Sequence, residues 1–299
     1  MTQAWDASIS KEHLWLEANG IRFHALADGP PSGPLVLLLH GFPELSLSWA
    51  KQLGPLAAAG YRAVAPDLRG YGQTSRSGPY DLRTLAKDVR GLIQALGRQS
   101  AVVVGHDWGG GVAYGAALFE PAVVSKLVIL NCPHPKVMAD ALQANPAQRR
   151  RSWYMFFFQL PWVPEWVVSR QRASAVARAL RGGSHVREVW TPEALEPYRT
   201  AFSDRSSARA AIGYYRAAFR GFWRTRRDPV HRIEVPTLIL WGRKDRFLGE
   251  DLLAPEKLAP CWSEGNSPTV RFVEDAGHFV QSEAPERVSQ ELVGWLGPA

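Results

Sequence analysis

Cysteine is scarce in this chain, with only Cys132 and Cys261 among 299 residues. Two cysteines cannot cross-link a fold of this size, and their spacing matches no zinc-binding pattern. We therefore expect free thiols, no structural metal, and a reducing compartment such as the cytoplasm. The opening residues 1–7 have neither a basic start nor an apolar core, so a secretion signal is not expected.

Long apolar runs are also missing. Runs such as Leu35–Leu39 have the length of a strand, whereas a membrane-spanning helix needs about 20 apolar residues. With 46% hydrophobic and 21% charged residues, the composition excludes wholesale disorder, collagen and coiled coil. The length suits one large α/β domain that carries an inserted subdomain.

The net charge of +7 is unevenly distributed. Residues 136–230 contain 16 arginines and one lysine against seven acidic residues, while the rest of the chain has 18 basic and 21 acidic residues. A basic segment raises the question of nucleic-acid or membrane binding. Because the arginines are scattered at helical spacing without a nucleic-acid motif, solvated helix faces explain them better, and neither partner is expected.

The first 130 residues alternate between strand-like and helix-like runs. Asn19-Gly20 between two apolar segments predicts a hairpin. The strand patterns that follow lie at 35–39, 62–65, 101–104 and 126–130, and the helical patterns at 48–59, 81–96 and 109–119. This alternation predicts a mainly parallel sheet with helices on both faces.

The pattern changes after Asn131. Residues 132–230 lack strand runs, and strand patterns return only at 235–241 and 269–273, followed by a helical pattern at 284–296. We therefore predict an α/β core made of residues 1–131 and 231–299, interrupted by a helical cap at 132–230.

The strongest local signal is an apolar strand that runs into Gly105-His106-Asp107-Trp108-Gly109-Gly110. A small-x-nucleophile-x-small pattern between strand and helix is a nucleophile elbow, whose small residues leave room for a tight turn. The central residue, Asp107, is a carboxylate, which can attack a saturated carbon and form an ester but excludes the serine-esterase route. The motif alone leaves a second interpretation open, in which Asp107 only caps the helix.

Two later residues favour the catalytic interpretation. Asp245 follows the strand pattern at 235–241, and His278 follows the one at 269–273. The order nucleophile, acid, histidine is that of α/β-hydrolases, and residues that follow parallel strands can meet at one edge of a sheet.

A loop that could support the nucleophile, His40-Gly41-Phe42-Pro43-Glu44, follows the strand at 35–39. The backbone N–H groups of Phe42 and Trp108 are candidates for an oxyanion hole. We expect a cis bond between Phe42 and Pro43. For His40 we favour a buried bracing role over a catalytic one.

The loop and elbow motifs resemble those of α/β-hydrolase-fold epoxide hydrolases of the soluble type, and the resemblance covers nearly the whole chain. It implies an eight-stranded, mostly parallel sheet with a helical cap, a small-molecule epoxide as substrate, and no cofactor or metal. It also implies that two cap tyrosines, Tyr154 and Tyr215, hold the epoxide oxygen, with the neighbouring Tyr214 as an alternative to Tyr215.

The resemblance also implies a reaction sequence. Asp107 opens the ring and becomes an ester, His278 activates the water that hydrolyses this ester, and Asp245 orients His278, so that the product is a vicinal diol. The cap aromatics would wall an apolar pocket or pack the cap's own core: Trp153, Phe156, Phe157, Phe158, Trp162 and Trp166. The predicted substrate contacts are Trp108, Phe42, Phe157, Phe279 and Phe247.

Two rival functions remain open. A haloalkane dehalogenase shares the fold and the aspartate nucleophile, but Phe42 occupies a loop position where such enzymes usually place a halide-binding Asn. Asn131 stands where some relatives place the catalytic acid, which leaves Asp245 as the acid here. The other rival is a ligand-binding protein that has lost hydrolysis, although every expected catalytic position is filled. The sequence leaves the particular epoxide open, and it allows either a monomer or a homodimer.

Overall fold

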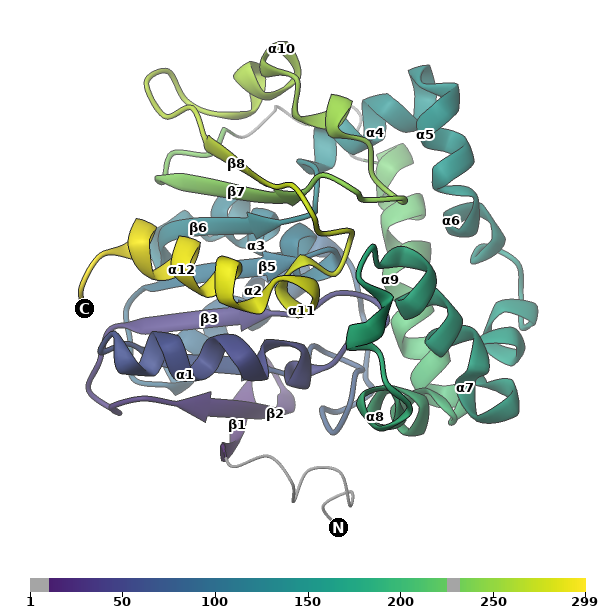
Figure 1. Ribbon diagram of the computed structural model, residues 1–299, viewed down its shortest axis with the longest axis horizontal. Coiled ribbons are helices and arrows are strands. Elements are labelled where there is room, and N and C mark those ends of the chain that lie inside the picture. Colours follow the sequence, from purple (N-terminus) through teal and green to yellow (C-terminus); the bar gives the residue numbers. More distant parts are fainter. Residues whose placement is uncertain (1–10, 225–231) are drawn as a thin grey trace.

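The computed structural model describes residues 11–224 and 232–299, and the side chains of 222–224 are not described. The segment examined for a secretion signal and the last residues of the predicted cap therefore lie outside the described residues. Within this range, eight strands form one sheet in the order β1-β2-β4-β3-β5-β6-β7-β8 (Figure 1). They are β1 (Glu12–Ala18), β2 (Ile21–Asp28), β3 (Leu35–Leu39), β4 (Arg62–Pro66), β5 (Ala101–His106), β6 (Val124–Leu130), β7 (Thr237–Gly242) and β8 (Thr269–Val273).

The direction of the strands confirms the predicted, mostly parallel sheet. β1 pairs antiparallel with β2, and β2 antiparallel with β4, whereas every later pair is parallel. The predicted hairpin is present, because Asn19 and Gly20 have φ of 47° and 70° and Ala18 pairs with Ile21. Positive φ at both central residues is what a two-residue type I′ turn requires.

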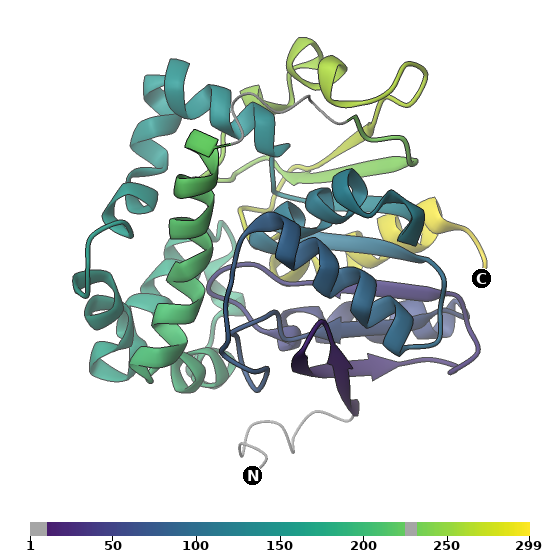
Figure 2. The same cartoon turned by 180° about the vertical axis from the view of Figure 1, so that it is seen from behind.

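Helices cover both faces of the sheet (Figures 1 and 2). On one face lie α1 (Ala50–Ala58), α11 (Val280–Glu283) and α12 (Pro285–Leu296); on the other lie α2 (Leu82–Ala95) and α3 (Trp108–Phe119). Alternate side chains of a strand point to opposite faces, so Leu37 and Leu39 pack into the core beneath α2 and α3. Val36 and Leu38 belong to the core beneath α1 and α12. This two-sided burial explains the continuous apolar run of β3.

The helices of the predicted cap gather beside the carboxyl ends of the parallel strands (Figure 1). They are α4 (Pro135–Ala144), α5 (Pro146–Arg151), α6 (Trp153–Phe157), α7 (Val163–Gly183), α8 (Pro192–Phe202) and α9 (Arg205–Arg224), and a short α10 (Pro255–Leu258) precedes β8. Within the described ranges, no helix combines the length and the apolar character needed to cross a bilayer. Both cysteines are buried free thiols, as predicted.

The turn between β5 and α3 depends on glycine. A Cβ atom on Gly105 would lie 2.2 Å from the carbonyl oxygen of Gly109, and one on Gly109 would lie 2.1 Å from that of Leu39. The backbone of the turn therefore packs against itself and against the end of β3 at distances that no side chain permits.

Gly105→Ala is expected to lower the free energy of unfolding by about 1–3 kcal/mol, because the new methyl group fits only if the backbone moves. Gly294→Ala is the matched control: it lies within α12, nothing lies within 4 Å of the added Cβ, and the change should stabilise the helix by up to about 1 kcal/mol. Urea unfolding of both variants measures the difference. Equal stability of the two would contradict the close packing of the turn.

Candidate active site

Asp107 occupies the turn between β5 and α3, with φ of 49° and ψ of −119°. Such a backbone conformation is unusual for a residue other than glycine and is typical of functional sites. The loop after β3 passes against this residue, since a Cβ on Gly41 would lie 2.5 Å from the Asp107 Cβ. All of α3 is described, yet the Asp107 carboxylate makes no capping hydrogen bond to it. The helix-cap interpretation therefore has no support.

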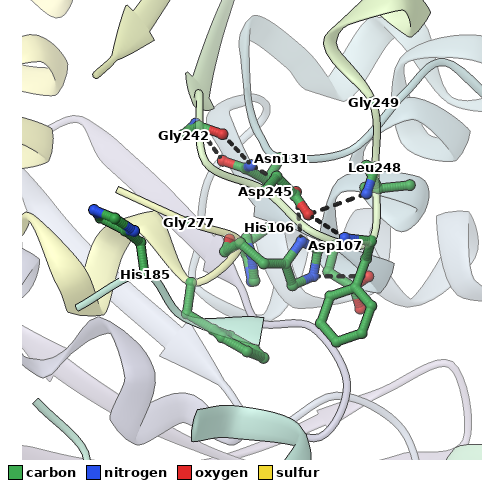
Figure 3. Close-up of polar contacts among 12 residues, drawn as sticks. His106, Asp107, Asn131, His185, Gly242, Asp245, Leu248, Gly249 and Gly277 are labelled. Atoms are coloured by element: carbon green, nitrogen blue, oxygen red, sulfur yellow. Dashed lines mark hydrogen bonds and ion pairs between the residues drawn. The ribbon is translucent and has the colours of Figure 1, made fainter. Parts of the chain in front are cut away.

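The imidazole of His278 lies between the carboxylates of Asp245 and Asp107, both of which are labelled in Figure 3. Its Nδ1 donates a hydrogen bond to Asp245 Oδ2 at 2.8 Å, and its Nε2 lies 3.5 Å from Asp107 Oδ2. Asp107 follows β5, Asp245 follows β7 and His278 follows β8. The structure brings the three residues together at the carboxyl edge of the sheet. This is the grouping that the order of the residues predicted.

The side chain of Asp245 is buried, and several donors hold its carboxylate. Oδ1 accepts the backbone N–H groups of Phe247 at 2.7 Å and Leu248 at 3.0 Å. Oδ2 accepts a hydrogen bond from His278, and a second one from the Asn131 side chain at 2.8 Å. These donors leave the carboxylate one orientation, which points Oδ2 at the imidazole.

Asn131 helps to hold the Asp245 carboxylate, a role that the sequence did not reveal. It follows β6, and besides contacting Asp245 it accepts the Gly242 N–H on Oδ1 at 2.9 Å. In the sequence, Asn131 marks only the absence of an alternative acid. The available signal was that Asn131 follows a predicted strand, as Asp107, Asp245 and His278 do.

The charges of the three groups stabilise one another. Burial favours the neutral imidazole, but the charge of Asp245 and hydrogen bonds with both carboxylates raise the pKa of His278 well above its ordinary value of 6.5. Burial would raise the pKa of Asp107 and of Asp245, but the contacts with His278 outweigh it and lower both. These contacts therefore favour the charged form of all three groups.

Buried polar side chains brace the loop that follows β3. His106 Nδ1 lies 2.6 Å from Glu44 Oε2, and its Nε2 lies 2.8 Å from the carbonyl oxygen of His278. His40 is fully buried, donates to the Gly41 carbonyl at 2.9 Å and accepts the Leu68 N–H at 3.0 Å. The bracing role predicted for His40 is confirmed.

The same loop presents a donor to the nucleophile. The bond between Phe42 and Pro43 is cis, as predicted. The Phe42 N–H donates to Asp107 Oδ1 at 2.8 Å, which is the contact expected of an oxyanion-hole amide. The second predicted donor, the Trp108 N–H, is the first amide of α3 and stays a prediction.

The two predicted tyrosines, Tyr154 of α6 and Tyr215 of α9, have ring centroids 5.9 Å apart. The Tyr215 ring also packs against Phe42 at 5.4 Å and Trp108 at 4.9 Å. Burial, and next the negative charge of Asp107, raise the pKa of both phenols well above 10.0. Both hydroxyls therefore stay protonated and available as donors near the nucleophile.

Tyr214 is engaged elsewhere. Its hydroxyl donates to the Arg69 carbonyl at 2.8 Å, and its ring stacks on Tyr80 at 5.4 Å. The geometry therefore favours Tyr215 over Tyr214 as the second tyrosine of the site.

Of the predicted pocket residues, Phe247 and Phe279 lie beside His278, whereas Phe157 contacts other aromatic residues. The Phe247 ring lies 5.7 Å from that of Tyr154 and 5.1 Å from that of His278. The Phe279 ring is buried 5.0 Å from that of His278. Phe157 is farther out, since its ring contacts are with Trp153 at 6.0 Å and Phe158 at 5.9 Å.

Most of the remaining cap aromatics face solvent. Phe158 is buried, with its ring 4.9 Å from that of Tyr215. Four others are 45% to 78% exposed: Trp153, Phe156, Trp162 and Trp166. The expectation that they are enclosed in a pocket wall or in the cap's core is wrong for these four, because α6 and the start of α7 turn them outward.

Comparison with known proteins agrees with this geometry. Residues 34–285 match the model of the α/β hydrolase fold family. The chain is 36% identical over 285 residues to the AB hydrolase superfamily protein YfhM of Bacillus subtilis (strain 168), covering 94% of this chain and 96% of that one. It is 34% identical over 295 residues to epoxide hydrolase 4 of Homo sapiens, covering 95% of this chain and 78% of the relative.

A solved structure supports the same assignment. The epoxide hydrolase of Bacillus megaterium in complex with an inhibitor superposes with a TM-score of 0.80 at 27% identity, covering 95% of this chain and 99% of that one. The chain therefore belongs to the α/β-hydrolase fold family, and within it to the group that contains these epoxide hydrolases.

Asp245→Asn is expected to lower the pKa of His278 toward its ordinary value of 6.5, because it removes the nearest charge that stabilises the imidazolium. NMR titration of the imidazole measures this change. Asp140→Asn, in an exposed ion pair with Lys136, is the control and should leave the titration unaltered. An unchanged pKa in the Asp245 variant would contradict the charge balance described above.

Proposed function

We propose that this protein hydrolyses epoxides to vicinal diols through an ester formed on Asp107. One observation carries the proposal: a carboxylate at the elbow lies within reach of an imidazole, and two protonated phenols lie within the influence of its charge. Relatives and a structural neighbour that are named epoxide hydrolases support it. An oxygen leaving group needs such phenols as hydrogen-bond donors.

The first step is ring opening. Asp107 Oδ1 accepts the Phe42 N–H, so Oδ2 is the oxygen that attacks a ring carbon. As the C–O bond breaks, Tyr154 and Tyr215 donate hydrogen bonds to the ring oxygen and then supply the proton that the alkoxide needs. The product of this step is a hydroxyalkyl ester whose carbonyl oxygen, Oδ1, already lies against the Phe42 amide.

The second step is hydrolysis of that ester. Ester formation removes the charge of Asp107, one of the two that raise the pKa of His278, so the imidazolium releases its proton more readily. This proton returns to the phenolate that ring opening left, and the neutral imidazole can act as a base. It then takes a proton from water, and the hydroxide so formed attacks the ester carbonyl carbon. The N–H groups of Phe42 and Trp108 stabilise the resulting oxyanion, at about 3 kcal/mol per donor. Collapse of the tetrahedral intermediate breaks the bond from this carbon to the alkyl oxygen, the proton of the added hydroxyl goes to that oxygen, and the diol leaves Asp107 as a carboxylate. Asp245 keeps Nδ1 protonated and stabilises the charged ring.

We assign residues 132–230 as a lid over a core of residues 1–131 and 231–299. The lid supplies both tyrosines, and its position beside the strand ends supports a role in excluding bulk water. Trp108, Phe42, Phe247 and Phe279 are the aromatic residues that we assign to the substrate pocket, with Phe157 at its margin. Buried free thiols favour a reducing compartment, for which we propose the cytoplasm.

His278→Gln is expected to permit alkylation of Asp107 but to block hydrolysis, because the base is removed while the nucleophile remains. Intact-mass spectrometry after exposure to a styrene-type epoxide should show a stable adduct of protein plus one substrate. Normal diol turnover by this variant would show that His278 is not the base. Release of halide from haloalkanes by the unmodified protein, without diol from epoxides, would favour the dehalogenase instead.

Changing both Tyr154 and Tyr215 to Phe is expected to abolish alkylation, with at least a 100-fold loss, since the leaving oxygen then has no donor. The readout is the rate of adduct formation in the His278→Gln background. Tyr214→Phe is the matched control, because the Tyr214 hydroxyl donates to the Arg69 carbonyl and not to a group of the candidate active site. Undiminished ring opening in the double variant would refute the assignment of the two phenols.

A further inference from the structure

Glu283, the last residue of α11, is a buried carboxylate outside the proposed reaction. Its Oε2 accepts the backbone N–H groups of His185 at 2.7 Å, Val186 at 2.9 Å and Gly277 at 2.9 Å. Its Oε1 accepts the N–H of Phe279 at 3.0 Å. Within the described residues, the hydrogen bonds of this carboxylate thus all come from backbone amides.

These amides belong to two separate segments of the chain. Gly277 and Phe279 flank His278, whereas His185 and Val186 follow the last helical turn of α7 in the proposed lid. Glu283 therefore joins the loop that carries the imidazole to the end of a lid helix.

A direct contact reinforces this junction. The N–H of His278 donates to the Gly183 carbonyl at 3.2 Å. A Cβ on Gly277 would lie 2.6 Å from the His185 nitrogen and 2.9 Å from the Gly183 oxygen, so the two segments touch backbone to backbone. Residues 277–279 form the loop that carries His278, here called the histidine loop. A shift of residues 183–186 would break these contacts unless the histidine loop moved as well.

A carboxylate in this position has a cost that its hydrogen bonds must offset. Burial of a charge is unfavourable unless donors replace its lost hydration. Backbone amides do so only while their segments keep one relative position. The energy of these hydrogen bonds therefore acts as a restraint on the backbone around His278.

We propose that Glu283 is a positioning residue that holds His278 between its two carboxylates and couples the lid to that placement. Glu283→Gln is the sharpest variant, because it preserves size while an NH₂ group replaces one acceptor oxygen. Whichever way the amide turns, its NH₂ faces at least one backbone N–H. The loop around His278 therefore loses a hydrogen bond either at Gly277 or at Phe279.

The test has two readouts, of which only the second rests on the proposed function. The first is NMR titration of His278 in the free protein, where a displaced imidazole should titrate at lower pH than in the unmodified protein. The second is single-turnover kinetics with a styrene-type epoxide. There, hydrolysis of the ester should slow by about 10- to 100-fold while alkylation proceeds at its normal rate.

Glu291→Gln is the matched control. Glu291 of α12 is also a buried glutamate near the C-terminus, but it pairs with two more exposed arginines, Arg271 of β8 and Arg287 of α12. A purely structural effect would lower the stability of both variants and slow both chemical steps alike. If Glu283→Gln does not fold, Glu283→Asp takes its place, because aspartate is too short to reach both segments. The same lower pKa of His278 and the same slower hydrolysis of the ester are then expected.

An unchanged titration of His278 in either folded Glu283 variant, together with equal effects on both chemical steps, would overturn the positioning role. If the unmodified protein does not convert epoxides at all, the proposed function fails. The titration then decides the role of Glu283 alone, and a lower pKa in the variant but not in the control still supports it.

Discussion

One imidazole shared between two carboxylates is the interaction on which the site depends. His278 lowers the pKa of Asp107 and of Asp245, and the two carboxylates in turn raise the pKa of His278. Removing His278 would leave both carboxylates without their shared partner, which is costly. The surrounding donors, the amides of Phe42 and Leu248 among them, share the task of replacing water.

The fold brings these groups together because parallel strands end at the same edge of the sheet. Each member of the triad follows a different strand, and the turn after β5 tightens until only glycine fits at 105 and 109. The unusual backbone of Asp107 results from this turn, which directs the side chain toward His278 and away from α3. The proposed reaction requires a side chain at position 107, whereas the tight packing of the turn leaves no room for one at positions 105 and 109. Glycine at these two positions therefore allows the turn to present Asp107.

Sequence patterns predicted the sheet and the triad because each depends on local signals, a strand followed by a particular residue. They did not predict Asn131 or Glu283, whose contacts join segments far apart in the chain. The choice between Tyr214 and Tyr215 needed the orientation of α9, since adjacent helical residues point about 100° apart. The exposed lid aromatics were misjudged for the same reason: a run of apolar residues gives no orientation for the helix that carries it.

The raised pKa of the two phenols constrains how the proposed ring opening proceeds. Asp107 must be ionised to attack, and its charge is one of the causes that make Tyr154 and Tyr215 weaker acids. Early in the reaction the phenols can therefore only donate hydrogen bonds. As the C–O bond breaks, negative charge leaves Asp107 and gathers on the ring oxygen, so the phenols become stronger acids when the oxygen becomes a stronger base. In the proposed reaction, proton transfer therefore follows bond cleavage, and the charge of Asp107 determines this order.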